Sequence, residues 1–332
     1  MTRLRLGKIP IDVLNRTVLR MTGARSGMVV TPPSAGLDFA AIKLDEGFLI
    51  VSADPITGVT SGIGSYAVNI SANDVATSGN RPQFIESVVL LPETAEPDDL
   101  MTIAGEMHRT ARALGISVVG GHTEVTPGLS RPIIIVTAFS VVKGYVSSKD
   151  ARPRDSLMMT KTAGIEGTAV IARERRIHGK GVPRGLALRA GRFVMRLSVV
   201  EEAVRAYATG CVHAMHDCTE GGVLGASYEM SLASGLGFVL DERKIPVAGE
   251  TRAICSLFSL DPLKLIGSGS VLMAVQKGSE ARVKEALKGV CQVATIGEFV
   301  ESRRVLVRRD GSETKIDSAP EDELWRLVGR AP

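Results

Sequence analysis

Acidic and amide side chains that could hold a metal ion and phosphate recur in the first half of the chain, within otherwise apolar sequence. Asp38, Asp54 and Asp74 come from three separate segments, and Asp54 directly follows an apolar run. Carboxylate oxygens are ligands that Mg²⁺ prefers. Asn69 and Asn73 share one face of a predicted helix, where buried polar groups need partners. Each residue alone could serve as a cap or turn residue, but together they predict a site for Mg²⁺ and phosphate.

A Gly-Gly-His-Thr sequence follows a predicted strand at Gly120, Gly121, His122 and Thr123. Paired glycines allow the backbone to approach a ligand closely. The imidazole of His122 could donate to a phosphoryl oxygen or act as a general acid or base near neutral pH. Alternatively, His122 only caps the turn by bonding Thr123 or Glu124. His122 is therefore a candidate catalytic residue, with this structural role as the alternative.

A further polar cluster in the second half joins a predicted strand to a predicted helix. It contains Asp217, Thr219, Glu220, Gly221 and Gly222. Thr219 and the two glycines could present N–H groups at the N-terminus of that helix, which is a natural seat for an anion. Asp217 and Glu220 could orient these donors or the substrate. The alternative is a helix cap with a glycine turn.

Apolar runs and turn residues predict alternating strands and helices that would position these side chains. In the first half, the strands are predicted at 47–53, 83–91, 116–119 and 132–142, and the helices at 64–78 and 98–114. In the second half, the strands are predicted at 157–161, 212–216, 270–275 and 293–300, and the helices at 166–176, 199–207, 222–233 and 279–288. The pattern predicts an α/β fold, an α+β sandwich with helices on one face of a mixed sheet.

A polar stretch at 147–155 separates the two halves and predicts two domains, residues 1–150 and 151–332. A length of 332 residues suits two domains, each with its own core.

No apolar run of membrane-spanning length and no signal peptide occur, so we expect a cytoplasmic protein without a membrane partner. The strand at 212–216 turns His213 and His216 to opposite faces, so they are poor candidates for a shared metal.

The composition disfavours several other classes of protein. The net charge is only +4, and aromatic residues make up 4% of the chain. The basic stretch 173–196 lacks interleaved stacking residues, so it predicts a solvated surface or a site for an anionic substrate rather than nucleic-acid binding. The four cysteines form no C-x-x-C pair. No P-loop or protein-kinase motif is present, and the G-x-G at 62–64 is a weak dinucleotide signal.

The motifs together resemble the aminoimidazole ribonucleotide synthetase (PurM-like) superfamily. In chain order they are Gly-x-Asp-x-Ala-Ala at 36–41, Asp54, Asn-Asp-x-x-x-x-Gly-x-x-Pro at 73–82, Gly-Gly-His-Thr at 120–123, and Asp-x-Thr-Glu-Gly-Gly at 217–222. The stretches 54–57 and 120–129 are most similar to the HypE-like branch, whose members act in hydrogenase maturation.

This resemblance implies a fold, a cofactor and a set of site residues. The protomer would have two domains, and the N-terminal domains of a homodimer would pair into a β-barrel with ATP in a cleft near that interface. Mg²⁺ would be held by Asp38, Asp54 and Asp74, and ATP would phosphorylate an amide or carbonyl oxygen of a small-molecule substrate. The expected catalytic residues are His122, Asp217 and Glu220, and the expected cofactor-binding residues are Asn73, Gly120, Gly121, Thr123, Thr219, Gly221 and Gly222.

Three departures from the HypE pattern leave the substrate open. HypE ends in a reactive cysteine, whereas this sequence has none after Cys291. The stretch 267–270 lacks the glutamate of an Asn-Glu-Gly motif, and Leu37 stands where a second acidic residue is common. The usual HypE reaction on a terminal cysteine is therefore not expected. The alternatives are a small-molecule kinase similar to thiamine-monophosphate kinase, and a non-catalytic HypE-like protein that binds a maturation partner.

Overall fold

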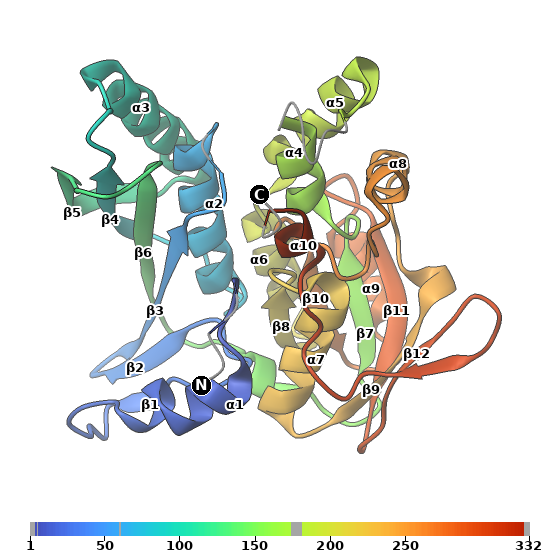
Figure 1. The fold of residues 1–332 in the computed structure, drawn as a ribbon. Coiled ribbons are helices and arrows are strands. Elements are labelled where there is room, and N and C mark those ends of the chain that lie inside the picture. The colour runs from blue at the N-terminus through green and yellow to red at the C-terminus, as the bar shows by residue number, and fades with distance from the viewer. Residues whose placement is uncertain (1–3, 5, 60, 174–180, 329–332) are drawn as a thin grey trace.

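Two β-sheets, one in each half of the chain, organise the computed structural model, which describes residues 4, 6–59, 61–173 and 181–328 (Figure 1). The six-stranded N-terminal sheet has the order β1-β2-β3-β6-β4-β5. Its strands are β1 (Val29–Thr31), β2 (Ala40–Leu44), β3 (Gly47–Ile56), β4 (Phe84–Leu91), β5 (Ser117–Val125) and β6 (Ile133–Val142). Only β4 and β5 pair in parallel, so the predicted mixed sheet is confirmed.

Helices α2 (Ile63–Ala76) and α3 (Pro97–Leu114) cover one face of this sheet. Along β6, buried residues such as Ile134 and Val136 alternate with partly exposed residues such as Ile135. This alternation is expected when only one face of an antiparallel sheet is covered. The other face of the N-terminal sheet is therefore left open in a single chain.

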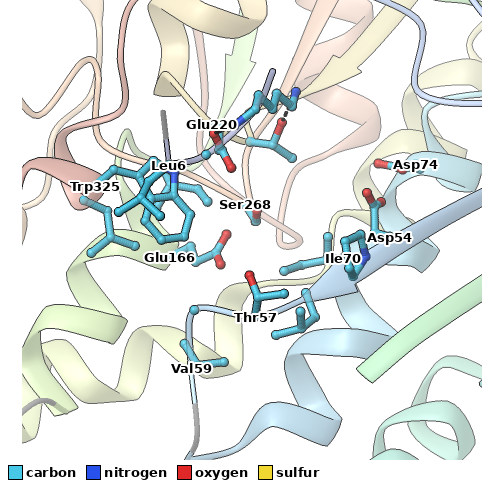
Figure 2. Close-up of a pocket in the computed structure, with 18 of the residues that line it drawn as sticks. Leu6, Asp54, Thr57, Val59, Ile70, Asp74, Glu166, Glu220, Ser268 and Trp325 are labelled. Carbon is cyan, nitrogen blue, oxygen red and sulfur yellow. Dashed lines mark hydrogen bonds between the residues drawn. The ribbon is translucent and has the colours of Figure 1, made fainter. Parts of the chain in front are cut away.

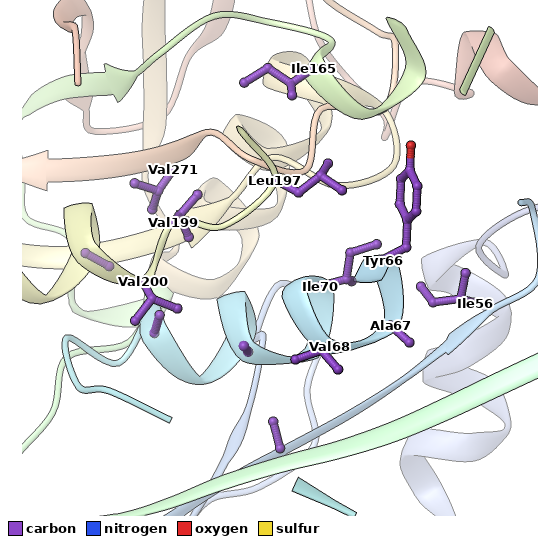
Figure 3. Close-up of a cluster of buried hydrophobic side chains, with 14 of the residues drawn as sticks. Ile56, Tyr66, Ala67, Val68, Ile70, Ile165, Leu197, Val199, Val200 and Val271 are labelled. Atoms are coloured by element: carbon purple, nitrogen blue, oxygen red, sulfur yellow. The ribbon is translucent and has the colours of Figure 1, made fainter. Parts of the chain in front are cut away.

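Helix α2 is the element that joins the two halves of the molecule. Nearly all of its residues are buried, as expected for a helix with neighbours all round. Figure 3 shows Ile70 and Tyr66 of α2 on the side that faces Leu197 and Ile165 of the second half. The polar residues that α2 carries are therefore held between the two domains.

The seven-stranded C-terminal sheet has the order β13-β12-β9-β11-β7-β10-β8. Its strands are β7 (Ser156–Thr160), β8 (Val212–Asp217), β9 (Gly237–Asp241), β10 (Val271–Val275), β11 (Val293–Val300), β12 (Arg304–Val307) and β13 (Glu313–Lys315). The described helices are α1 (Ile11–Arg16), α4 (Ile165–Arg173), α5 (Arg184–Gly191), α6 (Val200–Ala208), α7 (Gly222–Ser234), α8 (Gly249–Phe258), α9 (Glu280–Ala286) and α10 (Glu323–Val328). Short 3₁₀ helices lie at Val18–Arg20, Ser148–Asp150, Arg192–Arg196 and Glu242–Lys244.

Both faces of the C-terminal sheet are buried. On β7, Leu157 and Met159 belong to a core that contains Met230 of α7, whereas Met158 belongs to a second core that contains Ile171 of α4. Alternate residues of a strand point to opposite faces. Helix α7 therefore covers one face of the sheet and α4 the other.

Strand β5 differs from its prediction because it continues to Val125 instead of ending at Val119. The Gly-Gly-His-Thr sequence therefore lies inside a strand and pairs in register with β4, with Gly121 opposite Ser87 and His122 opposite Val88. All residues of β5 are exposed because it is the edge strand. An edge strand without a buried face lacks the apolar pattern that sequence reasoning depends on. Among the described residues, no helix has the length and apolarity needed to cross a membrane.

Candidate active site

A pocket of about 970 Å³ lies between the two domains and is lined by residues of both (Figure 2). The first domain contributes the end of β3 with the loop after it, and α2. The second domain contributes the end of β8, the start of α4, and α10. Residues 6–9, near the N-terminus, also line the pocket. The pocket thus collects residues that are far apart in the sequence.

Four aspartates from both domains line this pocket: Asp38, Asp54, Asp74 and Asp217. Burial raises the pKa of Asp74 well above its usual value, and the nearby charges of Asp54, Asp217 and Asp38 raise it further. Asp54 and Asp74 lie next to each other in Figure 2. The hydroxyl of Ser52 donates to Asp74 Oδ2 at 2.6 Å. The three aspartates predicted from the sequence are therefore brought together, and Asp217 joins them.

Asp217 has the least compensated carboxylate in this group. It ends β8, is 1% exposed, and both of its oxygens are buried without a hydrogen-bond partner. Burial raises its pKa well above the usual value, and Asp38 and Asp54 add to this effect. A buried carboxylate without partners is costly. A cation bound between these aspartates would remove that cost.

Part of the negative charge is balanced by His216 and Lys8. His216 Nδ1 lies 2.5 Å from Asp38 Oδ1, and its Nε2 lies 3.1 Å from Glu229 Oε2. Burial alone would lower the pKa of His216, but Asp38 and Glu229 raise it to about 10. Lys8 Nζ lies 3.1 Å from Glu229 Oε1. Burial would raise the pKa of Glu229, but Lys8 and His216 lower it to about 2.

The donor set in the pocket fits Mg²⁺. Asp38, His216 and Asp217 offer ligand atoms within 4.8 Å of one another. A metal-binding imidazole must be neutral, whereas His216 is held protonated by two carboxylates. Mg²⁺ also prefers oxygen ligands. The carboxylates of Asp38, Asp54, Asp74 and Asp217 are therefore the suitable ligands, and His216 is a neighbouring positive charge.

Thr219 and Glu220 also line the pocket, as predicted, and both contact Lys8. Lys8 Nζ donates to Thr219 Oγ1 at 3.3 Å, and the backbone N–H of Lys8 donates to Glu220 Oε2 at 2.7 Å. Burial alone would lower the pKa of Lys8, but Glu229, Glu220 and Asp38 raise it above its usual value. A permanent positive charge therefore stands beside the acidic group, where an anionic phosphate could be neutralised.

Three other predicted cofactor-binding residues make internal contacts instead. Asn73 Nδ2 donates to the carbonyl of Leu197, and Asn73 Oδ1 accepts from the N–H of Val199, both at 2.8 Å. The N–H of Gly221 donates to Asp322 Oδ2 at 2.7 Å, and the N–H of Gly222 donates to the carbonyl of Thr219 at 3.0 Å. Because these donors are already satisfied, neither glycine offers a free N–H seat for an anion.

The four residues Gly120, Gly121, His122 and Thr123 are not brought to this pocket within one chain. They lie on the exposed edge strand β5 and are not among the described residues that line the pocket. His122 Nε2 lies 3.0 Å from Glu124 Oε2, which is the local contact considered as the alternative. A Cβ on Gly121 would lie 2.0 Å from the carbonyl oxygen of Ser87, so this glycine permits the pairing of β5 with β4.

The basic stretch 173–196 does not reach the pocket in the part of the chain that the structure describes, and residues 174–180 lie outside the described residues. Arg189 Nε lies 3.3 Å from Glu250 Oε1, and Arg173 donates to the carbonyl of Ser61 at 3.1 Å. These contacts are typical of a solvated surface. No described residue of this stretch supports a site for an anionic substrate in the pocket.

The pocket residues that the sequence reasoning missed include Lys8, Glu166, His216 and Glu229. His216 was considered only together with His213, which instead contacts Asp155 at 2.9 Å on the opposite face. Glu229 lies on α7, two turns after the glycines that were considered. Glu166 opens α4, where an acidic residue is usually explained by the helix dipole. Each of these residues has its role through a residue that is distant in the sequence, so no local pattern could reveal it.

The fold and this pocket define a class of proteins with two α/β domains and a carboxylate-lined cleft between them. Residues 36–142 match the family described as AIR synthase related protein, N-terminal domain, and residues 152–310 match the AIR synthase related protein, C-terminal domain. The chain therefore belongs to the AIR synthase related family, as the motifs had indicated.

Relatives and solved structures agree with this assignment. The chain is 28% identical to carbamoyl dehydratase HypE of Cupriavidus necator over 308 residues, which cover 88% of this chain and 86% of the relative. A crystal structure of a HypE–HypF complex matches with a TM-score of 0.76 at 22% identity, covering 92% of this chain and 99% of the other. The structure of hydrogenase maturation protein HypE in complex with ATP matches with a TM-score of 0.72 at 21% identity, covering 94% and 95%. The predicted fold and HypE-like resemblance are thereby confirmed.

Proposed function

We propose that the chain is an Mg²⁺- and ATP-dependent enzyme that phosphorylates an amide or carbonyl oxygen of a small molecule. The observation that carries this proposal is Asp217, whose two buried oxygens lack partners in a pocket shared with three other aspartates. The ATP complex of a HypE protein with the same fold supports nucleotide use. The relative named carbamoyl dehydratase supports chemistry on an amide-like group.

In this proposal, one group of pocket residues binds Mg²⁺ and another group binds the phosphates of ATP. Asp38, Asp54, Asp74 and Asp217 would hold Mg²⁺ through oxygen atoms. Bound Mg²⁺ would neutralise phosphate charge during the transfer. The ammonium of Lys8 and the hydroxyl of Thr219, 3.3 Å apart, can donate to phosphate oxygens. Glu220 and Glu229 hold Lys8 in position.

Glu220 and Glu229 act as positioning residues in this proposal. Glu220 accepts the backbone N–H of Lys8 and so holds the N-terminal segment against the pocket. Glu229 lies between Lys8 and His216 and fixes both cations. This arrangement keeps the positive charges of Lys8 and His216 beside the acidic group, with His216 in contact with Asp38. Glu220 therefore acts through Lys8, rather than by orienting the N–H donors or the substrate as the sequence had suggested.

The proposal is tested by Mg²⁺-dependent release of ADP from ATP. We expect release that stops on addition of a chelator and falls roughly 100-fold in Asp217→Asn. The matched control is Asp45→Asn, because Asp45 is exposed in the turn between β2 and β3. Unchanged ADP release in Asp217→Asn would contradict the proposed role of the acidic pocket. Absence of ATP binding to the unaltered chain would contradict the proposed function itself.

The fate of the γ-phosphate of ATP distinguishes the proposed enzyme from a small-molecule kinase and from a non-catalytic partner protein. A small-molecule kinase would leave the γ-phosphate on a stable acceptor, whereas an activated amide would release it as inorganic phosphate. A non-catalytic partner would bind a maturation protein, as the HypE–HypF complex illustrates for HypE, without any ADP release.

We also propose that the protein acts in the cytoplasm, where ATP and Mg²⁺ are supplied, and as a homodimer. The open face of the N-terminal sheet supports the homodimer.

A further inference from the structure

Helix α5 lies at the upper end of the second domain, beyond α4 (Figure 1). The 3₁₀ helix Arg192–Arg196 follows α5 directly, so residues 184–196 form one helical segment. Among the described residues that line the pocket, none comes from this segment. Its inner face packs against the hydrophobic core through Leu186, Ala190 and Phe193. The segment is therefore held in place by one apolar face.

The outer face of the same segment is exposed, although half of it is apolar. Leu188 is 63% exposed and Met195 is 85% exposed. They alternate with the exposed Arg184 and Arg192, in the order Arg-Leu-Arg-Met at spacings of four, four and three residues. Residues three and four apart lie on the same side of a helix, so these side chains form one stripe. A face that only meets water is usually polar throughout, which indicates a further role for this Arg-Leu-Arg-Met stripe.

The positive charge of the stripe is not balanced by neighbouring acidic residues. Residues 181–200 contain four arginines and no acidic residue. Arg189 Nε lies 3.3 Å from Glu250 Oε1 of α8, but the described part of the chain supplies no acidic partner to Arg184 or Arg192. A molecule that fits the stripe should therefore bring acidic groups to these two arginines and apolar groups to the side chains between them.

We propose that the Arg-Leu-Arg-Met stripe is a docking surface for an acidic amphipathic helix of a partner protein. Such a helix carries acidic and apolar residues alternately at the same spacing, so both kinds of side chain meet their counterparts when the two helices pack side by side. Arginine and methionine are enriched at protein–protein interfaces, and the flexible thioether of Met195 adapts to the shape of a partner. The stripe lies outside the pocket, so this inference does not depend on the proposed function.

Two other classes of partner fit the stripe less well. Single-stranded nucleic acid is bound by basic side chains together with exposed aromatic rings, whereas Phe193, the one aromatic residue in 181–200, is buried in the core. A membrane surface takes up a helix with a continuous apolar face, whereas Arg192 separates Leu188 from Met195 along the stripe. A protein helix with alternating acidic and apolar residues therefore matches the stripe best.

The first test measures the binding of labelled synthetic peptides to the intact chain by fluorescence anisotropy. The probe is a helical peptide with leucine along one face and glutamate beside each leucine. One comparison peptide has lysine in place of every glutamate, and the other has glutamine in place of every leucine. We expect saturable binding of the probe that is at least about tenfold tighter than binding of either comparison peptide. Absence of probe binding, or equal binding of all three peptides, would overturn the proposal.

The second test asks whether the probe binds at the stripe. Leu188→Gln combined with Met195→Gln should weaken probe binding about tenfold or more. The matched control is Val18→Gln combined with Met101→Gln, because these apolar side chains are similarly exposed, at 63% and 73%, on other elements. Full binding by the stripe variant, or an equal loss in the control, would assign the binding to another surface and contradict the proposal.

The third test reverses the charge of the stripe and gives a result that a loss of folding cannot produce. Arg184→Glu combined with Arg192→Glu should bind the lysine peptide more tightly than the glutamate peptide, which reverses the order of affinities. An unchanged preference for the glutamate peptide would show that these arginines do not bind the partner. The unaltered chain is also tested for displacement of the probe by phosphatidylglycerol vesicles and by a thymidine oligonucleotide. If either displaces the probe more effectively than unlabelled probe does, a membrane or a nucleic acid replaces the protein helix, and the proposal is wrong.

Discussion

Burial raises the pKa of Asp74, on α2 in the first domain, and the charge of Asp217, at the end of β8 in the second domain, raises it further. The two buried carboxylates therefore couple the domains through repulsion, and this repulsion opposes folding. Such a cost is expected where function requires a charge arrangement that the folded chain alone does not neutralise. A metal ion between the domains would turn this repulsion into attraction.

Asp74→Asn should make the chain more stable while weakening its metal binding. The neutral amide removes the repulsion and can still accept the hydrogen bond from Ser52. We expect the melting temperature without metal to rise by about 2 °C or more. The rise caused by added Mg²⁺ in the unaltered chain should be much smaller in the variant. Thermal unfolding with and without Mg²⁺ checks both points. A loss of stability in Asp74→Asn would show that Asp74 is mainly a structural hydrogen-bond acceptor.

Gly222→Ala should lower stability rather than nucleotide affinity. The backbone φ of Gly222 is +59°, and a Cβ there would lie 2.7 Å from the carbonyl oxygens of Leu263 and Leu265. Strain and close contact together should cost about 2–4 kcal/mol. Gly235→Ala is a matched control at the other end of α7, because its φ is +74° with no neighbour within 4 Å. Urea denaturation compares the two variants. Equal costs would show that the close approach relaxes freely.

Asn73→Ala should weaken the contact between the domains. It leaves the carbonyl of Leu197 and the N–H of Val199 without their partner, which should cost about 2–4 kcal/mol in unfolding free energy. The control is Asn69→Ala, because Asn69 bonds only the carbonyl of Ser65 within the same helix, at 2.8 Å. Chemical denaturation measures both losses. A direct role of Asn73 in nucleotide binding would instead appear as lost ATP affinity at unchanged stability.

The sequence predicted the elements with a clear apolar period, and it predicted the aspartates that follow them. Helix α2 was placed within two residues of its observed ends because apolar residues recur along its whole length. The sequence did not predict the full length of β5, because neither face of this strand is buried. Nor did it find His216 and Glu229, because their roles arise from contacts that no local pattern contains. The misplaced roles of Asn73 and Gly222 share this cause, since both depend on partners from distant segments.

The stability of the chain should depend on the ionisation of Glu166. Its folded pKa is about 7 against an ordinary value of 4.5, so the folded chain holds the proton more tightly than the unfolded chain. Stability is therefore lost as the pH rises from about 4.5 through 7, by at most about 3 kcal/mol. Glu166→Gln cannot ionise, so it should match the unaltered chain near pH 4.5 and exceed its stability at pH 8. Denaturation curves at both pH values check this, and a constant difference would mean that Glu166 is not buried as a neutral acid.

The open face of the N-terminal sheet should pair two protomers. Phe84 and Phe139 stack on neighbouring strands with ring centroids 5.5 Å apart, and Val141 on the same face of β6 is 47% exposed. An apolar face of this kind usually marks an interface, and a closed two-fold pair is the commonest arrangement. We expect light scattering at micromolar concentration to give a dimer mass, and Val141→Glu to give a monomer without loss of fold. Met101→Glu is the control, because Met101 is 73% exposed on α3, on the covered side of the sheet.

His122 gains a route to catalysis only through such a dimer. Within one chain it lies on exposed β5 beside Glu124 and does not line the pocket. If a second protomer brings His122 to the nucleotide, His122→Asn should lower ADP release roughly 100-fold, and the monomeric Val141→Glu should show a comparable loss. If the unaltered chain is a monomer that releases ADP, the dimer prediction is wrong, and the imidazole of His122 has only its local contact with Glu124. Turnover measured beside light scattering on the same samples decides between these outcomes, because the two losses must appear together when the pairing of the sheets supplies the histidine.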